Sequence, residues 1–161
     1  MQFIFSISTF ILYVRAQGRE TSLLRIRSRQ RSMGSAMAEG GKRGVLVVED
    51  DNDLRRLFGM LLSAEDFEVF EAADGIAGLR ALEDNPGAID LVLTDLGLPG
   101  LGGVELISRV RAASPAVKII GTSGFGARNV REMVLSAGAD EFFSKPFSMG
   151  DVIEKVKTMT Q

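Results

Sequence analysis

Apolar and polar residues follow two alternating patterns along most of the chain. Short apolar runs predict five strands, at 45–48, 67–71, 91–94, 117–121 and 141–143. Apolar residues spaced three and four apart predict a helix after each strand, at about 53–62, 74–83, 103–112, 127–137 and 148–158. Asn52 is the expected N-cap of the first helix, and Ile76 and Met133 are expected to face the core. A strand followed by a helix therefore recurs five times.

This alternation with short loops is typical of the α/β class. It implies a (βα)5 protein, in which right-handed crossovers build one doubly wound, five-stranded parallel sheet with helices on both faces. The carboxyl ends of parallel strands meet at one edge of such a sheet, and the loops there form its functional edge. Residues that follow each strand are therefore the first place to search for chemistry.

Residues 1–43 show a different pattern, without the alternation of strand and helix that marks the rest of the chain. Their apolar run, Gln2 to Val14, is shorter than the roughly 20 residues that a transmembrane helix needs. A signal peptide carries positive charge before its apolar run, whereas here the arginines follow it. One interpretation is a membrane anchor or basic tether. The favoured one is a disordered extension, or a start assigned too early, with Met33 or Met37 as the true start and the domain at 44–161.

Two residue types that often carry chemistry are missing from the chain. It contains no cysteine and no histidine, which excludes disulfides, thiolate nucleophiles, histidine zinc sites and serine–histidine hydrolysis. Carboxylates, hydroxyls, lysine and backbone oxygens remain. Oxygen ligands of this kind favour a hard cation such as Mg2+.

Charge is distributed unevenly along the chain. Residues 1–43 carry eight Lys or Arg and two Glu, whereas residues 44–161 carry eleven Lys or Arg and nineteen Asp or Glu. The predicted domain is therefore acidic, which argues against nucleic acid as its own ligand.

Reactive side chains follow four of the five predicted strands. Glu49 and Asp50 follow the first strand, Asp95 the third, Ser123 the fourth and Lys145 the fifth. Three carboxylates in one crevice repel one another unless a cation joins them. A divalent ion, an ammonium group and a hydroxyl could together neutralise the oxygens of an incoming phosphoryl group. Asp95 would be the nucleophile, because a carboxylate can form an acyl phosphate.

Each of these residues has an ordinary interpretation when taken singly. An acid after a strand is often a helix N-cap, Lys145 could be a surface lysine, and Ser123 could be a turn residue. The glycine-rich stretch 121–126 lacks the Gly-Lys-Ser/Thr ending of a nucleotide-binding P-loop and does not follow the first strand. The joint placement at consecutive strand ends is what favours a functional site.

The chain resembles the receiver domain of two-component response regulators, the CheY-like fold, over about residues 44–160. Four segments carry the resemblance: Val45–Asp51, Asp90–Gly100, Ser123–Gly124 and Gly138–Phe147. The resemblance implies a flavodoxin-like sheet with strand order 2-1-3-4-5. It also implies a phosphorylation-gated switch, not a turnover enzyme.

The resemblance implies a role for each residue of the acidic edge. Asp95 matches the phosphoacceptor, and Asp50 the acid that binds Mg2+, or Mn2+ in its place, directly. Glu49, which stands where Asp is commoner, would act through a water molecule. The backbone carbonyl of Gly97 would complete the metal shell.

The resemblance also implies the parts of the switch. Ser123 matches the switch hydroxyl, Lys145 the lysine that contacts the phosphoryl group, and Phe142 the switch aromatic residue. Pro146 would follow a cis peptide bond. Gly97 and Phe125 hold the positions that tune hydrolysis, and since neither side chain can hydrogen-bond to water, self-dephosphorylation is expected to be slow.

The implied partners are proteins. A histidine kinase or histidine phosphotransfer protein would supply the phosphoryl group, and a downstream effector would bind through about residues 126–158. We expect a cytoplasmic protein without nucleic-acid or membrane binding. We also expect its output to go through a partner protein, because the chain ends at Gln161, just after the last predicted helix, and no effector domain follows there. A stand-alone regulator, a relay intermediate and a receiver from a hybrid kinase all remain open.

Two other classes of protein share some of these features. A phosphatase of the haloacid-dehalogenase kind also uses an aspartate nucleophile. It requires a second Asp two residues later, where this chain has Gly97, and its nucleophile follows the first strand, whereas Asp95 follows the third. An interaction module that is never phosphorylated is disfavoured by the intact set of acids, hydroxyl and lysine.

Overall fold

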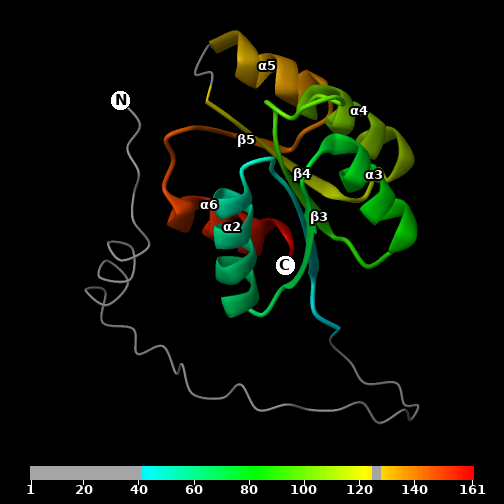
Figure 1. Cartoon of the computed structure of the whole chain (residues 1–161), viewed down its shortest axis with the longest axis vertical. Coiled ribbons are helices and arrows are strands. Elements are labelled where there is room, and N and C mark those ends of the chain that lie inside the picture. Colours follow the sequence, from blue (N-terminus) through cyan, green and yellow to red (C-terminus); the bar gives the residue numbers. More distant parts are fainter. Residues whose placement is uncertain (1–40, 125–127) are drawn as a thin grey trace. The chain divides into compact units, whose positions relative to one another are not determined.

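Five parallel strands form one sheet in the order β2-β1-β3-β4-β5, which confirms the predicted fold class (Figure 1). The computed structural model describes residues 41–124 and 128–161, apart from the side chain of Arg128. The strands are β1 Gly44–Val48, β2 Glu68–Ala72, β3 Leu91–Asp95, β4 Lys118–Ser123 and β5 Glu141–Ser144. Each expected strand is therefore present, with ends shifted by at most two residues.

Within the described residues, five helices cover the two faces of this sheet. They are α2 Asn52–Ala64, α3 Gly75–Asp84, α4 Gly103–Ala113, α5 Arg128–Ser136 and α6 Met149–Met159. Helices α2 and α6 lie on one face, and α3, α4 and α5 lie on the other (Figure 1). The structure is thus doubly wound, as predicted from the alternation of strands and helices.

The central strands are buried on both faces. Val45 and Val47 of β1 pack with Phe58 of α2, whereas Leu46 and Val48 point to the other face and pack with residues such as Leu106 of α4. Successive side chains of a strand point to opposite faces, so a strand with helices on both sides must be apolar throughout. This explains the continuous apolar runs, in contrast to the alternation expected for a half-exposed strand.

The first helix begins one residue earlier than predicted. Asp51, and not Asn52, is the N-cap, and its Oδ1 accepts hydrogen bonds from the amides of Asp53 and Leu54, each at 2.9 Å. An Asp side chain satisfies such free amides as well as Asn does. The amide oxygen of Asn52 instead accepts a hydrogen bond from Arg55, at 2.8 Å.

Two side chains that were expected in the core are exposed. Ile76 is 52% exposed and Met133 is 47% exposed. Helix α3 approaches the sheet through glycines: a Cβ added at Gly78 would lie 3.0 Å from Cγ2 of Val48. This close approach turns the glycine face inward, so that Ile76 lies at the side. In α5, the fully buried Val134 takes the inward position next to Met133.

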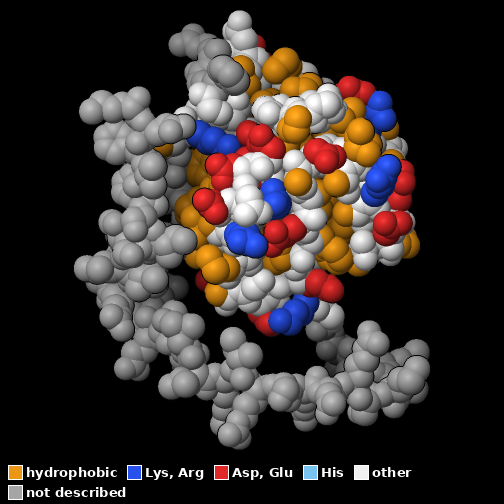
Figure 2. All heavy atoms as spheres, viewed as in Figure 1, with side chains coloured by type: hydrophobic (Ala, Val, Ile, Leu, Met, Phe, Trp, Pro, Cys, Tyr) orange, Lys and Arg blue, Asp and Glu red, His pale blue; other side chains and the backbone are white. Residues whose placement is uncertain are grey.

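The predicted N-terminal extension lies almost wholly outside the described residues, and its boundary at residue 44 stays a prediction. Among the residues that are described, no helix is both long enough and apolar enough to cross a membrane. Acidic and basic side chains are interspersed with apolar ones on the face of the domain in Figure 2. That face therefore offers no broad basic surface, within the described residues, of the kind that binds nucleic-acid phosphates.

Candidate functional site

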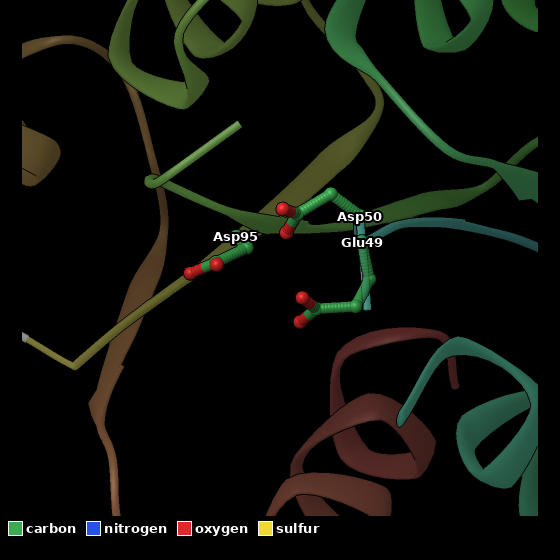
Figure 3. Close-up of side chains that lie close together, drawn as sticks. All are labelled: Glu49, Asp50 and Asp95. Carbon is green, nitrogen blue, oxygen red and sulfur yellow. The ribbon is translucent and has the colours of Figure 1, made fainter. Parts of the chain in front are cut away.

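Three carboxylates meet at the carboxyl edge of the sheet. Glu49 and Asp50 directly follow β1, and Asp95 ends β3, the neighbouring parallel strand in which Thr94 pairs with Val48. One carboxylate oxygen from each acid lies within 4.8 Å of the other two, and the three side chains lie close together (Figure 3). Glu49 is only 3% exposed, whereas Asp50 is open to solvent. The site therefore has a buried wall and an accessible side.

Lys145 brings an ammonium group into contact with this cluster. Its Nζ lies 3.1 Å from Oε2 of Glu49 and 3.3 Å from Oδ2 of Asp95. The backbone holds the lysine in place, because its amide donates a 2.7 Å hydrogen bond to the carbonyl of Ser123, at the end of β4. The Lys145–Pro146 peptide bond is cis. Residues from four different strand ends are thus joined in one contact network.

The charges of the cluster perturb one another. Burial raises the pKa of Glu49, and the nearby Asp95 carboxylate adds to this, although Lys145 opposes both. Burial alone would lower the pKa of Lys145, but the carboxylates of Glu49 and Asp95 outweigh it, so the pKa is raised. The lysine therefore stays charged at neutral pH, while the acids carry more negative charge than one ammonium can balance.

The donor set fits a hard divalent cation. The three acids offer carboxylate oxygens that lie within 4.8 Å of one another, and the cluster is accessible from the Asp50 side. Magnesium binds in proteins through one or two carboxylates together with water. The role predicted for the Gly97 carbonyl stays a prediction. Gly97 does border the site, because a Cβ added there would lie 3.5 Å from Oδ2 of Asp95.

The carboxylate of Asp95 is oriented from both sides. Its Oδ1 accepts a 2.9 Å hydrogen bond from the amide of Leu96, and its Oδ2 contacts Lys145. The turn behind it is closely packed, since a Cβ added at Gly103 would lie 2.2 Å from the carbonyl oxygen of Asp95. A carboxylate held in this way, with one ammonium beside it, is arranged to act as a nucleophile toward an anionic group.

The predicted switch residues lie at the same edge or beside it. Ser123 is buried at the end of β4, the strand that pairs with β3. Phe142 is only 8% exposed and packs in the core cluster that also contains Val134. The ring of the predicted switch aromatic residue is therefore buried in this structure. Phe125, the second predicted lifetime-tuning residue, lies outside the described residues.

One residue that supports the site was not anticipated from the sequence. Arg55 of α2 donates a hydrogen bond from its guanidinium to the backbone carbonyl of Glu49, at 2.6 Å. An arginine in the first turns of an amphipathic helix is ordinarily solvated, so the position of Arg55 in the sequence does not by itself indicate a contact with the site. Only the Asp-rich turn just before the helix hints at a cation nearby.

Comparison with known proteins matches most of the chain to one domain family. The response regulator receiver domain family matches residues 45–157. The KDP operon transcriptional regulatory protein KdpE of Escherichia coli is 37% identical over 113 residues, which cover 70% of this chain and 49% of that protein. Sporulation initiation phosphotransferase F of Bacillus subtilis is 28% identical over 114 residues, covering 70% of this chain and 90% of that protein.

The match to several longer relatives is partial. The chain covers 27% of a cyclic di-GMP phosphodiesterase of Thermotoga maritima and 48% of the transcriptional regulatory protein PrrA of Mycobacterium tuberculosis. Among solved structures, a CheY-like response regulator receiver domain protein of Methanospirillum hungatei superposes with a TM-score of 0.69 at 30% identity. That superposition covers 73% of this chain and 93% of the other.

Proposed function

The chain belongs to the response regulator receiver domain family, and from this premise we propose that Asp95 is the residue that accepts the phosphoryl group. Receiver domains are phosphoacceptor signalling switches of two-component systems, and this chain is one of them. The observation that carries the assignment is the convergence on Asp95 of a lysine at 3.3 Å and two further acids.

The proposed transfer forms one bond and breaks one. An oxygen of Asp95 attacks the phosphorus of a phosphohistidine, the P–O bond forms, and the P–N bond breaks with its electron pair left on the imidazole. Lys145 lies next to the attacking carboxylate and is charged, so it can pair with an oxygen of the incoming phosphoryl group. The Leu96 amide orients the same carboxylate from its other oxygen.

Receiver domains generally bind Mg2+ at an acidic pocket, and the residues of this pocket fit it. We propose that Asp50 and Asp95 would bind the ion directly, Glu49 through water and Gly97 through its carbonyl, with Mn2+ as a substitute. When bound, the ion would supply positive charge for the phosphoryl oxygens. The residues' own part is to hold oxygen atoms together that would otherwise repel one another.

The proposed switch links the site to a protein-binding surface. Ser123 would contact a phosphoryl oxygen, and Phe142 would be held in its buried position by that change. Both residues lie on strands next to α5, in the region of about 126–158 that we propose as the effector surface. Residues 126 and 127 of this region lie outside the described part of the chain.

The partners follow from the chemistry of transfer. Receiver domains interact with histidine kinases or phosphotransfer proteins, and we propose one of these as the donor. A cytoplasmic location and a protein effector are part of the same proposal. The acidic charge of residues 44–161 supports output without nucleic-acid binding by the domain itself.

A labelling experiment tests this function. The full chain is incubated with Mg2+ and a small phosphodonor such as acetyl phosphate, and intact-mass spectrometry detects the added phosphoryl group. We expect one group on the wild type and none on Asp95→Asn. A parallel assay with a phosphomonoester should show no turnover, because the chain has Gly97 where an aspartate phosphatase needs a general acid. Rapid turnover of the ester would favour the phosphatase class instead.

A further inference from the structure

Arg55 lies directly behind the acidic edge and is largely buried. Its side chain is 13% exposed, its NH1 donates a 2.6 Å hydrogen bond to the carbonyl of Glu49, and its NH2 donates a 2.8 Å hydrogen bond to Asn52. Burial of an arginine is unfavourable unless its charge and donors are matched by partners.

An acid on β2 also holds the arginine in place. Oε2 of Glu71, on β2, lies 3.6 Å from Nε of Arg55. The carboxylate of Glu71 reaches over Gly59 of α2, where an added Cβ would lie 2.6 Å from Oε1. Glycine at position 59 thus leaves the room in which Glu71 reaches toward the guanidinium. Helix α2 and strand β2 thus together hold the guanidinium that donates to the Glu49 carbonyl.

The supported carbonyl belongs to the peptide that joins the two acids after β1. On its other side, the amide of Glu49 donates a 3.1 Å hydrogen bond to the carbonyl of Ala72. The backbone of Glu49 is therefore fixed at both its N–H and its C=O. This orientation decides where the side chains of Glu49 and Asp50 point, since both follow from the same short stretch of backbone.

We propose that Arg55 is a positioning residue of the cation site: it holds the Glu49–Asp50 backbone so that both carboxylates face Asp95. This inference rests on the proposed function, because it concerns the same acidic site. Without the guanidinium, the Glu49 carbonyl would lose a charged donor beside three carboxylates, and the turn would relax away from them. The negative charge of Glu71 offsets the positive charge of the Arg55 guanidinium. The arginine therefore repels a divalent cation less strongly than an unpaired arginine would.

The test measures Mg2+ binding directly, by isothermal titration calorimetry of the full chain without any phosphodonor. Arg55→Met keeps an apolar stem but removes every donor, and its Kd for Mg2+ should rise about tenfold, as for other residues that orient metal ligands. Arg55→Lys, which retains the charge and some donors, should restore part of the affinity. Arg56→Met, an exposed arginine of the same helix, is the matched control and should bind as the wild type does.

A kinetic split separates positioning from a general loss of structure. The rate of labelling by a small phosphodonor is measured against Mg2+ concentration for each variant. Arg55→Met should need more Mg2+ for half-maximal labelling, while its rate at saturating Mg2+ stays close to that of the wild type. A merely structural role would lower the thermal midpoint and leave the Mg2+ dependence unchanged.

Two variants keep the proposal testable if Arg55→Met does not fold. Glu71→Gln and Arg55→Lys should both weaken Mg2+ binding, to a smaller degree than Arg55→Met. Wild-type affinity in folded forms of these variants would overturn the inference, as would failure of the wild type to bind Mg2+. A wild type that binds Mg2+ but is never labelled would instead refute Asp95 as phosphoacceptor and leave the role of Arg55 standing.

Discussion

The ammonium nitrogen of Lys145 lies 3.1 Å from Oε2 of Glu49, a residue 96 positions earlier in the chain. The same nitrogen contacts Asp95 at 3.3 Å, so the lysine lies between two acids of the proposed cation site. It neutralises part of their charge, and a divalent cation would do the same. Lysine and cation therefore compete for the same carboxylates, and the direction in which Mg2+ affinity changes when the lysine charge is removed measures this competition.

Removal of the lysine charge should tighten Mg2+ binding. In Lys145→Gln, the carboxylates of Glu49 and Asp95 lose their ammonium partner, and we expect the Kd for Mg2+ to fall about tenfold, equivalent to roughly 1.4 kcal/mol. Calorimetry at fixed ionic strength measures this change. Lys157→Gln, whose lysine pairs with Glu65 away from the site, is the control. Weaker Mg2+ binding in Lys145→Gln would show that the lysine organises the acids instead of competing for them.

Binding of Mg2+ should weaken in mild acid. The pKa of Glu49 is raised from its ordinary value of 4.5 by burial and by Asp95, against the opposing effect of Lys145. A proton therefore occupies this carboxyl at a higher pH than in an ordinary glutamate, and it competes with the cation. Titrations at a series of pH values should show affinity falling as pH falls through the raised pKa. If the affinity for Mg2+ stayed unchanged down to pH 4.5, this result would contradict the role of Glu49.

The raised pKa of Glu49 also predicts how the stability of the protein changes with pH when no divalent cation is present. Because the folded-state pKa of Glu49 is above the unfolded value, the folded state binds more protons between the two values. The contribution of Glu49 to the free energy of unfolding should thus decrease as pH rises through the folded pKa. Urea unfolding of the wild type and Glu49→Gln, compared across this range, measures that trend. A difference that grows in favour of the wild type with rising pH would oppose it.

Gly103 should tolerate no side chain. A Cβ there would lie 2.2 Å from the carbonyl oxygen of Asp95 and 2.6 Å from Cα of Leu96, both backbone atoms that cannot move aside cheaply. Gly103→Ala should lower the free energy of unfolding by roughly 1–3 kcal/mol, as overpacking commonly does. Gly102→Ala is the matched control, because nothing lies within 4 Å of the added Cβ. Equal stability of the two variants would argue against the close turn behind Asp95.

The lifetime of the phosphorylated form should depend on position 97. Glycine there cannot orient a water molecule, and an added Cβ would lie 3.5 Å from Oδ2 of Asp95. We expect the wild type to lose its phosphoryl group slowly and Gly97→Asn to lose it faster, with Gly97→Ala close to the wild type. The phosphorylated protein is freed of donor and followed by intact mass. Decay of the wild type within seconds would refute the expectation.

The sequence was sufficient to predict the fold and the convergence of the acids. Apolar runs mark β1 and β3 because helices bury both of their faces, and parallel pairing then brings Asp50 and Asp95 to one edge. These features depend on local patterns and on general rules of α/β topology. They can therefore be predicted from the sequence alone.

Other features depend on packing that no local pattern records. The rotation of α3 is decided by how closely Gly78 approaches Val48, and the exposure of Ile76 follows from it. The contact of Arg55 with the Glu49 carbonyl likewise requires the room that Gly59 leaves for Glu71. Such contacts join residues from separate elements, so they emerge only when the elements are placed together.

Locating the phosphoryl group on the chain tests the central claim most directly. The labelled protein is reduced with borohydride, which converts an aspartyl phosphate to homoserine, and then digested and sequenced by tandem mass spectrometry. Homoserine should appear at position 95 alone, and Asp95→Asn should yield none, while Asp50→Asn should be labelled at Asp95 only at higher Mg2+ concentration. Homoserine at Asp50 or at any other acid, or persistent labelling of Asp95→Asn, would contradict the assignment of Asp95.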